Sequence, residues 1–474
     1  IASMLRPEVI RDLRLRRHGL RMVPCEPGLQ LAFPDGEILP WWSSADRTAA
    51  EIARLSPPDA RAFLALDARL KRLAGYLQPY ILEPPPDVHA RGIRRARALV
   101  RLGRRLRRIT GGEVADLTRL LAGSVRDLVD RRFESEQVKT LFAANNVYGL
   151  HGSPSRPGTA IGLLFHSLAG GEHQARGFYG HVIGGMGAVS DAVARAARGL
   201  GAEIRTGAPV AAVDVRGGRA RGVVLEDGTE IAARVVLSNA DPKRTFLGLV
   251  DKGELPDDFR AEVAGIRMDG PCAKVNLVLD EEPRLAAMPE DAGPGRRAMF
   301  TLLPSSSFAD RCYEIALRGE IPERLWVDCV VASNVDPTLA PAGRHVMTCF
   351  VQFVPYRLRD GTWDEKRELL GDRVLATIAE YAPNVPRSVV ARHVLTPLDL
   401  ERTYGLTEGN IFHGDLSIDQ LFFMRPVPGW AGYRTPVNGL YLCGAGAHPG
   451  GGVTGAPGRN AAGVVLRDLR RAGR

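Results

Sequence analysis

The glycine-rich segment near the end of the chain limits the fold more than any other feature. Seven glycines fall within the fifteen residues from Gly444 to Gly458, inside GLYLCGAGAHPGGGVTGAPGRNAA. An apolar strand pattern precedes these glycines, and a helical pattern starting near Thr454 follows them. Missing side chains allow close approach to the backbone, and the free N–H groups of a helix start favour negative charge. The pattern predicts a ligand site, although glycine-rich turns also close ordinary strand-to-helix junctions.

Composition places the chain among ordinary globular proteins. Its 474 residues are 45% hydrophobic and 25% charged, and they include 52 glycines. This balance disfavours disordered, collagen-like and disulfide-scaffold proteins. The length corresponds to roughly three domains at about 150 residues each.

Cysteine usage argues against a metal centre and a dithiol centre. The six cysteines form no CxxC motif, no closely spaced pair and no cluster with histidine at metal-ligand spacing. We therefore expect buried, reduced cysteines and no metal site. No apolar run approaches the roughly 20 residues of a transmembrane helix, and no signal peptide is evident. These features predict an intracellular protein, either cytoplasmic or peripherally membrane-associated, with a mitochondrial location if the source is eukaryotic.

A local excess of arginine accounts for much of the formal net charge of +9. Nine arginines and no acidic residue lie between Arg91 and Arg108, around one apolar stripe of a predicted helix over 91–109. A helix of this kind can lie in a membrane surface, with its arginines on lipid phosphates. It can equally be a solvated basic face over an ordinary core stripe. Nucleic acid is not expected as a partner, because no aromatic side chains interleave with the arginines.

Helical and strand patterns divide the chain into successive parts. Residues 44–147 are mainly helical, and 151–241 follow the order helix, strand, hairpin, strand that is typical of a nucleotide-binding layer. One strand is expected over 202–215, and the preceding helix is expected to bury Val189, Ala192, Val193 and Ala196. Residues 246–433 predict a mostly antiparallel sheet covered by helices. Its candidate strands are AKVNLVLD, LWVDCVVAS and HVMTCFVQFV, and its candidate helices span 305–317 and 363–381.

Six ordered stretches of the chain carry a family resemblance. They are LRPEVIRDLRLRRHGL, GGMGAVSDAVARAA, VVLSNADPKRTFLGLV, DPTLAPAGRHVM, LTPLDLERTYGLTEGNIFHGDLSIDQLFFMRPVPGW and GLYLCGAGAHPGGG. The sequence resembles the FAD-dependent phytoene desaturase and carotenoid and retinoid oxidoreductase family, within the wider amine-oxidase-like flavoproteins. A flavin also suits a helix N-terminus, because its N1 and C2 carbonyl become electron-rich on reduction.

The resemblance implies an α/β fold with a discontinuous FAD-binding domain of the Rossmann-like, amine-oxidase type. A mixed α+β substrate domain and a helical lid interleave with that domain. Residues 1–43 would be a remnant of the N-terminal FAD and substrate layer, and 44–150 the helical lid. Residues 151–245 and 436–474 would form the middle and C-terminal parts of the FAD-binding domain, with the substrate domain at 246–435.

The resemblance also assigns residues to the cofactor. Gly444, Ala445 and Gly446 would approach the FAD pyrophosphate and ribityl chain, and Gly452, Val453 and Thr454 would lie by the isoalloxazine ring. The adenine end would be contacted by the backbone of Val210, and Asn239 and Ala240 would close the same pocket. The turn made by Gly184, Gly185, Met186 and Gly187 would face the flavin from the substrate side, or would simply be a tight turn before a helix.

One family feature is absent from the sequence. Family members begin with a strand, a GxGxxG turn and a helix that hold the FAD diphosphate, and no GxGxxG occurs near the start of this sequence. The chain, which begins at Ile1, therefore resembles a family member that lacks roughly its first fifty residues, about one βαβ unit. On this hypothesis the chain as given binds FAD weakly or not at all.

The sequence predicts an oxidoreductase that passes a hydride between flavin N5 and a C–H bond of an apolar or amphiphilic substrate. His448 is the first candidate for proton transfer, with a structural histidine as the alternative. His413 and Asp415 form a second polar cluster. A carotenoid desaturase or ketolase remains open, as does a binding or regulatory protein that keeps the flavoprotein fold without turnover. The sequence does not indicate an oligomeric state or an electron acceptor.

Overall fold

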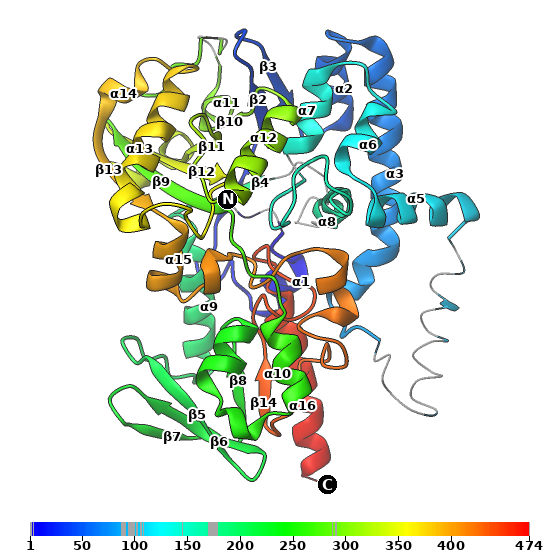
Figure 1. Cartoon of the computed structure of the whole chain (residues 1–474), viewed down its shortest axis with the longest axis vertical. Helices are drawn as coiled ribbons and strands as arrows, with labels where there is room; N and C mark the ends of the chain where they lie inside the picture. The colour runs from blue at the N-terminus through cyan, green and yellow to red at the C-terminus, as the bar shows by residue number, and fades with distance from the viewer. Residues whose placement is uncertain are drawn as a thin grey trace.

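The computed structural model describes residue 2 and residues 4–86, 92, 100, 103–104, 107, 109–144, 146–168, 179–286, 288–289 and 292–473. The predicted basic helix over 91–109 lies mostly outside the described residues. Figure 1 shows two halves: a large sheet with its helices above, and two small sheets around the last helix below.

A seven-stranded sheet forms the upper half. Its order is β13 (Val389–Leu395), β9 (Cys272–Leu279), β12 (His345–Gln352), β11 (Trp326–Val331), β10 (Met299–Leu302), β2 (Leu29–Ala32) and β3 (Ile38–Trp41). Neighbouring strands are antiparallel except for β10 and β2. The mostly antiparallel prediction is therefore confirmed, and β2 and β3 bring the N-terminal segment into this sheet as a hairpin.

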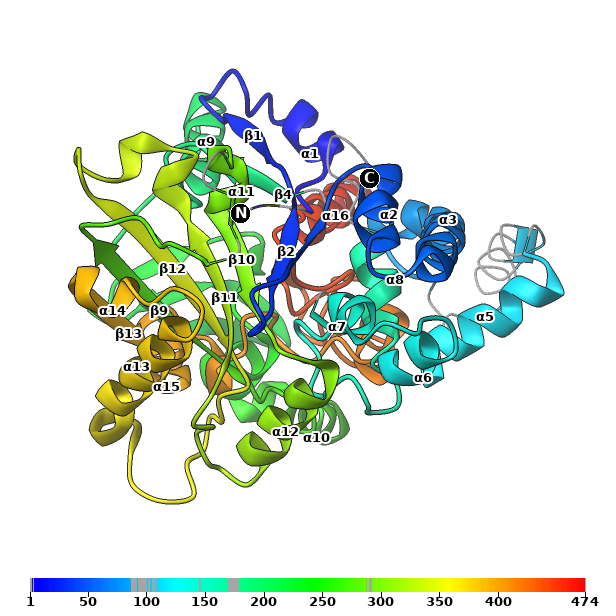
Figure 2. The same ribbon diagram turned by 90° about the horizontal axis from the view of Figure 1, so that it is seen from above.

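Apolar side chains cover both faces of this sheet. On β11, Val327, Cys329 and Val331 pack toward α13 (Trp363–Ala379). Trp326 and Val330 point to the other face of the sheet, where a second layer of helices covers them. Figure 2 shows the sheet between these two helical layers. The helical layer opposite α13 consists of α2 (Ala45–Ala53), α3 (Pro57–Ile81), α5 (Gly111–Ala122), α6 (Val125–Asp130), α7 (Glu136–Ala144), α8 (Ile161–Ser167) and α12 (Ser306–Leu317). The side chain of Ser44 caps α2 by accepting a hydrogen bond from the Arg47 backbone N–H.

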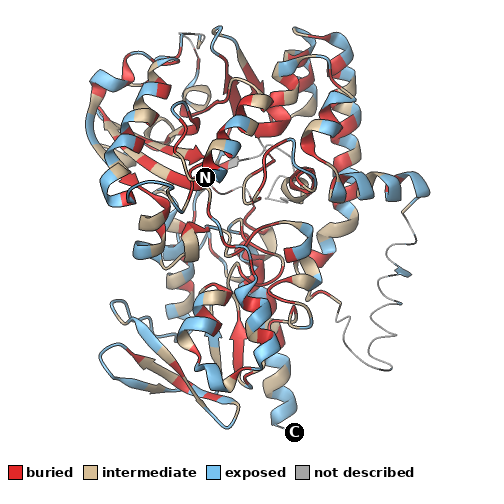
Figure 3. Ribbon diagram, viewed as in Figure 1, coloured by how far each residue is buried: buried red, intermediate tan, exposed pale blue. Residues whose placement is uncertain are grey.

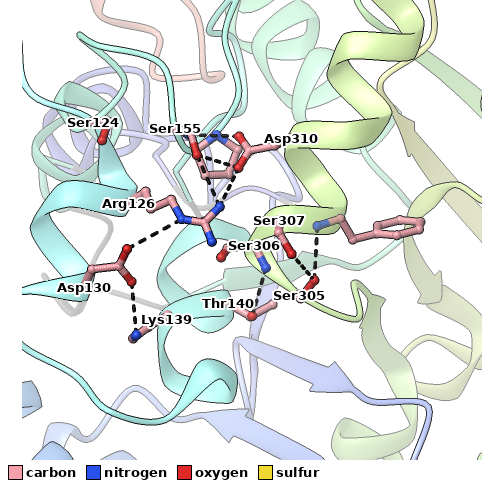
Figure 4. A network of polar contacts seen from close by, with 12 residues as sticks. Ser124, Arg126, Asp130, Lys139, Thr140, Ser155, Ser305, Ser306, Ser307 and Asp310 are labelled. Carbon is pink, nitrogen blue, oxygen red and sulfur yellow. Dashed lines mark hydrogen bonds and ion pairs between the residues drawn. The ribbon is translucent and has the colours of Figure 1, made fainter.

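A polar network joins α12 to α6 and α7 within this helical layer (Figure 4). Asp310 on α12 pairs with Arg126 on α6 at 2.9 Å, and its Oδ1 accepts the Ser155 backbone N–H at 3.0 Å. Nearby, the Ser306 backbone N–H donates to Thr140 Oγ1 on α7. The start of α12 is thus held from two helices of the segment at once.

The lower half contains the strand that precedes the glycine-rich segment. This strand, β14 (Leu440–Leu442), pairs in parallel with β8 (Val236–Ser238), so the tail returns to the layer formed by the middle of the chain. The last helix, α16 (Ala456–Ala472), and α10 (Asp257–Ala264) pack with these strands. Beside them, β5 (Val210–Arg216), β6 (Arg219–Leu225) and β7 (Glu230–Ala232) form a three-stranded sheet that is more exposed than the large one (Figure 3).

Short elements complete the described fold. Helix α1 (Pro7–Asp12) and α9 (Gly187–Gly199) pack around the pair β1 (Met22–Cys25) and β4 (Tyr179–Val182). The others are α11 (Pro294–Ala298), α14 (Val385–Ser388), α15 (Pro397–Tyr404) and a π-helix at Arg244–Leu249. Among the residues described, no helix is both long and apolar enough to cross a membrane.

Two local predictions were wrong. The strand predicted over 202–215 is only β5, because the preceding residues form turns and extended loop. Val193 was expected inside α9, but it is 37% exposed, whereas Val189, Ala192 and Ala196 are buried. The side chain of Val193 contributes instead to the cavity described next.

Candidate functional site

A cavity of about 700 Å³ lies where β14 ends and α16 begins. We call it the glycine cavity; 443–445, 450–455 and 457–459 form most of its wall. The remaining lining residues are Val9, Asp12 and Leu13 from the α1 region, with Val193, Asn239, Ile411, His413 and Ala462. This volume lies within the usual range of about 300–1,000 Å³ for small-molecule and cofactor sites.

Most of the sequence-predicted cofactor residues meet at this cavity. Its lining includes Asn239, Gly444, Ala445, Gly452, Val453 and Thr454. Ala240 and Gly446 are not among the lining residues, although each is next to one that is. Val210, at the start of β5, is 37% exposed and is likewise not part of the lining.

The first glycines of the segment serve packing within the protein. A Cβ on Gly444 would lie 2.3 Å from the Asn239 carbonyl oxygen, and one on Gly446 would lie 2.4 Å from Cδ of Pro242. Both contacts are far too short for any side chain. These two glycines therefore let the turn after β14 press against the residues after β8, whereas the sequence argument attributed them to the approach of a ligand.

The second group of glycines shapes the cavity wall through backbone conformation. Gly450, Gly452 and Gly455 have φ angles of 112°, 101° and 69°, which glycine adopts without steric cost. Between them, Val453 has a φ of 57° and a side chain that is 51% exposed. A β-branched residue at positive φ is strained, and strain of this kind is typical of ligand-binding sites.

The start of α16 points its first turn at the cavity. The Thr454 hydroxyl oxygen accepts the Ala456 backbone N–H at 3.1 Å, and Gly455 serves as the left-handed N-cap. Gly455, Pro457 and Gly458 all line the cavity. The partial positive charge of a helix N-terminus therefore faces the cavity and favours a group that acquires negative charge.

His448, the first candidate for proton transfer, is not among the lining residues. It is 4% exposed, and its Nε2–H donates to the Tyr80 carbonyl oxygen at 2.8 Å. Burial lowers the pKa of His448 to about 4, so the imidazole is neutral at pH 7. These contacts tie the glycine-rich segment to the end of α3, which matches the structural alternative considered for this residue.

His413 and Asp415, paired in the sequence argument, point to different surroundings. His413 lines the glycine cavity. Asp415 is 4% exposed; it accepts the His151 backbone N–H at 3.0 Å and pairs with Arg267 at 3.3 Å. Asp415 therefore anchors the loop formed by residues 410–415, whereas His413 borders the glycine cavity.

Arg425, which the sequence argument missed, is a buried cation behind the cavity wall. Its guanidinium is enclosed by backbone carbonyls, and it donates to Ala445 O at 2.9 Å and Phe412 O at 2.6 Å. Burial lowers the pKa of Arg425 to about 10, so it stays charged at pH 7. The partners of Arg425 are backbone carbonyl oxygens, which a sequence pattern does not reveal. The one available signal was that FFMRP follows FHGDL closely in the sequence.

The turn Gly184–Gly187 is not part of the cavity lining. The Gly184 backbone N–H donates to Asp336 Oδ2 at 2.6 Å, and Gly184 and Gly185 have positive φ angles of 85° and 79°. Met186 is 36% exposed. These residues form a tight turn before α9, tied to the 3₁₀ segment that begins at Pro337.

The family described as flavin containing amine oxidoreductase matches this chain over residues 82–466. A rat protein named pyridine nucleotide-disulfide oxidoreductase domain-containing protein 2 is 39% identical and covers 99% of this chain and 84% of its own length. A neurosporene-forming phytoene desaturase from Rhodobacter capsulatus is 27% identical over 91% of this chain and 76% of its own. These matches confirm the family resemblance drawn from the sequence.

Among solved structures, a putrescine oxidase superposes with a TM-score of 0.57 at 15% identity, covering 99% of this chain and 87% of its own. At that identity the likeness concerns the fold alone. The predicted α/β fold of the amine-oxidase type is confirmed, and so are the oxidoreductase class and the flavin cofactor at the level of the family.

The cysteines do not form the redox pair that the rat protein's name suggests. All six are free, and five are buried. Cys329 and Cys349 do face each other across β11 and β12, a pairing that the sequence spacing did not reveal. They lie in the core between the sheet and α13, and burial raises the pKa of Cys329 well above its ordinary value. Neither one borders the glycine cavity.

Proposed function

The chain belongs to the flavin-containing amine oxidoreductase family, and on this premise we propose that it removes a hydride from a C–H bond of an apolar or amphiphilic organic substrate, with FAD in the glycine cavity. The observation that carries the proposal is the cavity itself. Its wall combines a run of side-chain-free backbone with the N-terminus of α16 and a few apolar side chains.

The residues of the cavity suit a flavin in shape and polarity. Between Gly450 and Gly455 only Val453 and Thr454 carry side chains, so a flat ring can lie against the backbone. The positive end of α16 suits the electron-rich edge of a reduced ring. FAD bound here would supply the acceptor for a hydride, which carries both electrons of the oxidation.

The contacts with FAD belong to this proposal. Gly452, Val453 and Thr454 would lie beside the isoalloxazine ring, and the turn at Gly444, Ala445 and Gly446 would lie near the pyrophosphate and ribityl chain. The adenine end would extend toward the backbone of Val210, with Asn239 and Ala240 on the same side. Gly184 to Gly187 remain the substrate-side turn in this proposal, where they position α9 and Val193 at the cavity edge.

The protein's own groups contribute position and electrostatics. The positive end of the α16 dipole stabilises negative charge that develops near it. The apolar side chains of Leu13, Ile411 and Val453 border the cavity and would offer apolar surface to the bound ring and substrate. A substrate bound beside this wall would hold its C–H bond next to the flavin, so that hydride transfer becomes an effectively unimolecular step.

A carotenoid desaturase or ketolase is the narrower version of this function. The relative from Rhodobacter capsulatus, whose name gives phytoene as its substrate, supports a polyene. Its identity is only 27%, so the broader class of apolar or amphiphilic substrates is the version we adopt. The alternative of a binding protein without turnover is disfavoured by membership of an oxidoreductase family.

Peripheral membrane contact through 91–109 would give such a substrate a route to the cavity. The arginine-rich composition of that segment supports electrostatic docking on anionic lipid. Binding to vesicles should then require anionic lipid and weaken as salt is added. Vesicle binding that is indifferent to both lipid charge and salt contradicts this docking.

The test of the function uses protein expressed from its complete coding sequence. We expect a yellow protein with the absorption bands of bound flavin, and anaerobic bleaching of those bands by an apolar donor such as phytoene or a shorter alkene. A polar amine donor such as putrescine should bleach them far more slowly. A colourless protein that does not bind added FAD, or bleaching by the polar amine alone, overturns the proposal.

A further inference from the structure

His413 occupies an unusual backbone position at the wall of the glycine cavity. It lies within the 410–415 loop with a φ of 58°. A non-glycine residue in this region is strained unless its surroundings hold it there. Its Nδ1 is buried and has no hydrogen-bond partner among the described residues. The structure thus maintains a costly conformation that places an imidazole beside the cavity.

The 410–415 loop is held from several directions. The Arg425 guanidinium donates to the carbonyl oxygens of Phe412, His413, Gly414 and Asp415 at 2.6–3.4 Å. Within the loop, Asn410 Oδ1 accepts the backbone N–H groups of Phe412 and Gly414. These bonds fix the backbone on both sides of His413, so Arg425 acts as a positioning residue for its ring.

Burial keeps the imidazole of His413 neutral, while the two charged groups near it act in opposite directions. Burial lowers the pKa of His413 below its ordinary value, and the nearby Arg425 lowers it further, while Asp241 opposes them. Asp241 is engaged elsewhere, because its two oxygens accept hydrogen bonds from the Arg244 backbone N–H and the Thr407 hydroxyl. At pH 7 the ring therefore has an unprotonated nitrogen that can accept a proton.

The other titratable side chains of the cavity wall are unsuited to this task. Asp12 and Arg459 pair with each other at 3.0 Å, which lowers the pKa of Asp12. Burial raises the pKa of Cys443 to about 11, so its thiol stays protonated. His413 is the one remaining titratable group among the lining residues described.

We propose that His413 is the catalytic base of the glycine cavity and accepts the proton that accompanies hydride transfer. This inference rests on the proposed function. A two-electron dehydrogenation removes two hydrogens from the substrate. One would leave its carbon as a hydride that FAD accepts, and the other would leave as a proton to the unprotonated ring nitrogen of neutral His413. The electron pair of the second bond forms the new double bond, and the imidazolium then releases its proton to water.

The test measures protons during reduction of the FAD-loaded protein and needs no substrate. An imidazole beside a reduced, negatively charged ring binds a proton more tightly than one beside the oxidised ring. We therefore expect electrochemical reduction between about pH 6 and 8, followed with an indicator dye, to take up close to one more proton per FAD in the wild type than in His413→Asn. Asparagine tolerates positive φ, so the loop is preserved.

Two further variants complete the experiment. His448→Gln should keep the wild-type proton uptake, because that residue does not border the cavity. His413→Gly should lose the extra proton and regain it with added imidazole. Equal uptake by wild type and His413→Asn overturns the role of His413 while leaving the proposed function intact. Loss of FAD binding in His413→Asn at unchanged melting temperature also overturns it, in favour of a binding contact, whereas a wild type without FAD refutes the proposed function.

Discussion

In the seven-stranded sheet, apolar side chains project from both faces of the central strands and are covered by helices, whereas the wall of the glycine cavity contains residues at positive φ and lies against a buried charge. The wall contains Val453 and His413 at positive φ, with the buried guanidinium of Arg425 behind them. Burial of apolar residues in the sheet raises the free energy of unfolding, whereas the strained residues of the wall lower it. Substitutions in the two regions should therefore have different consequences.

The largest expected effect is loss of stability from the sheet region. Phe353, directly after β12, is fully buried and packs its ring against Tyr313 and Trp326 at centroid distances of 5.1 and 5.8 Å. Phe353→Ala should lower the free energy of unfolding by about 3–5 kcal/mol, measured by urea denaturation. The affinity of the folded protein for FAD should not change. Leu317→Ala, at an exposed position on α12, is the control and should change stability by less than about 0.5 kcal/mol.

A smaller effect is expected from pH at the junction between the two regions. The pKa of His448 is lowered by burial to about 4 in the folded protein, whereas an unfolded histidine titrates near 6.5. As pH falls from about 6.5 to 4, the unfolded chain binds a proton that the folded chain does not, so stability falls by about 3 kcal/mol. Above pH 6.5 this loss is absent.

His448→Gln should remove that part of the pH dependence. The variant keeps a side-chain donor for Tyr80 and retains His181, whose pKa burial also lowers to about 4. Denaturation curves at several pH values should therefore show a weaker acid dependence than in the wild type. An unchanged dependence would contradict the structural role of His448.

The smallest effect should have the opposite sign for stability. Val453→Gly removes a β-branched side chain from a φ of 57° and should raise the free energy of unfolding by about 1 kcal/mol. It should also weaken FAD binding about tenfold, because apolar surface against the ring is lost. Val390→Gly is the matched control: Val390 is equally exposed, at 51%, but lies in β13. That control should lose stability and leave FAD affinity unchanged.

The sequence predicted the sheet well because the signal is local. Runs rich in apolar and β-branched residues placed β9, β11 and β12 with nearly correct bounds, and helical spacing placed Val189, Ala192 and Ala196 on the buried face of α9. Where the alternation was weak, before β5, the predicted strand was too long. The spacing of apolar residues within a helix or strand is enough to predict which of its faces is buried.

The cavity wall was predicted only in outline because its structure depends on distant contacts. The glycine pattern located the site, but Gly444 and Gly446 are required by Asn239 and Pro242, about two hundred residues earlier in the chain. The conformation of His413 depends on backbone contacts with Arg425. Positive φ at a histidine or valine has no sequence signature. The sequence therefore favoured His448, which is adjacent to the glycines, over His413 as the proton-transfer residue.

Amide hydrogen exchange with and without FAD tests the central claim most directly, on protein expressed from its complete coding sequence. The account predicts that FAD slows exchange in 444–458 and in the 410–415 loop and leaves β9, β11 and β12 unchanged. FAD binding that leaves exchange in both wall segments unaltered would contradict the glycine cavity as the flavin site.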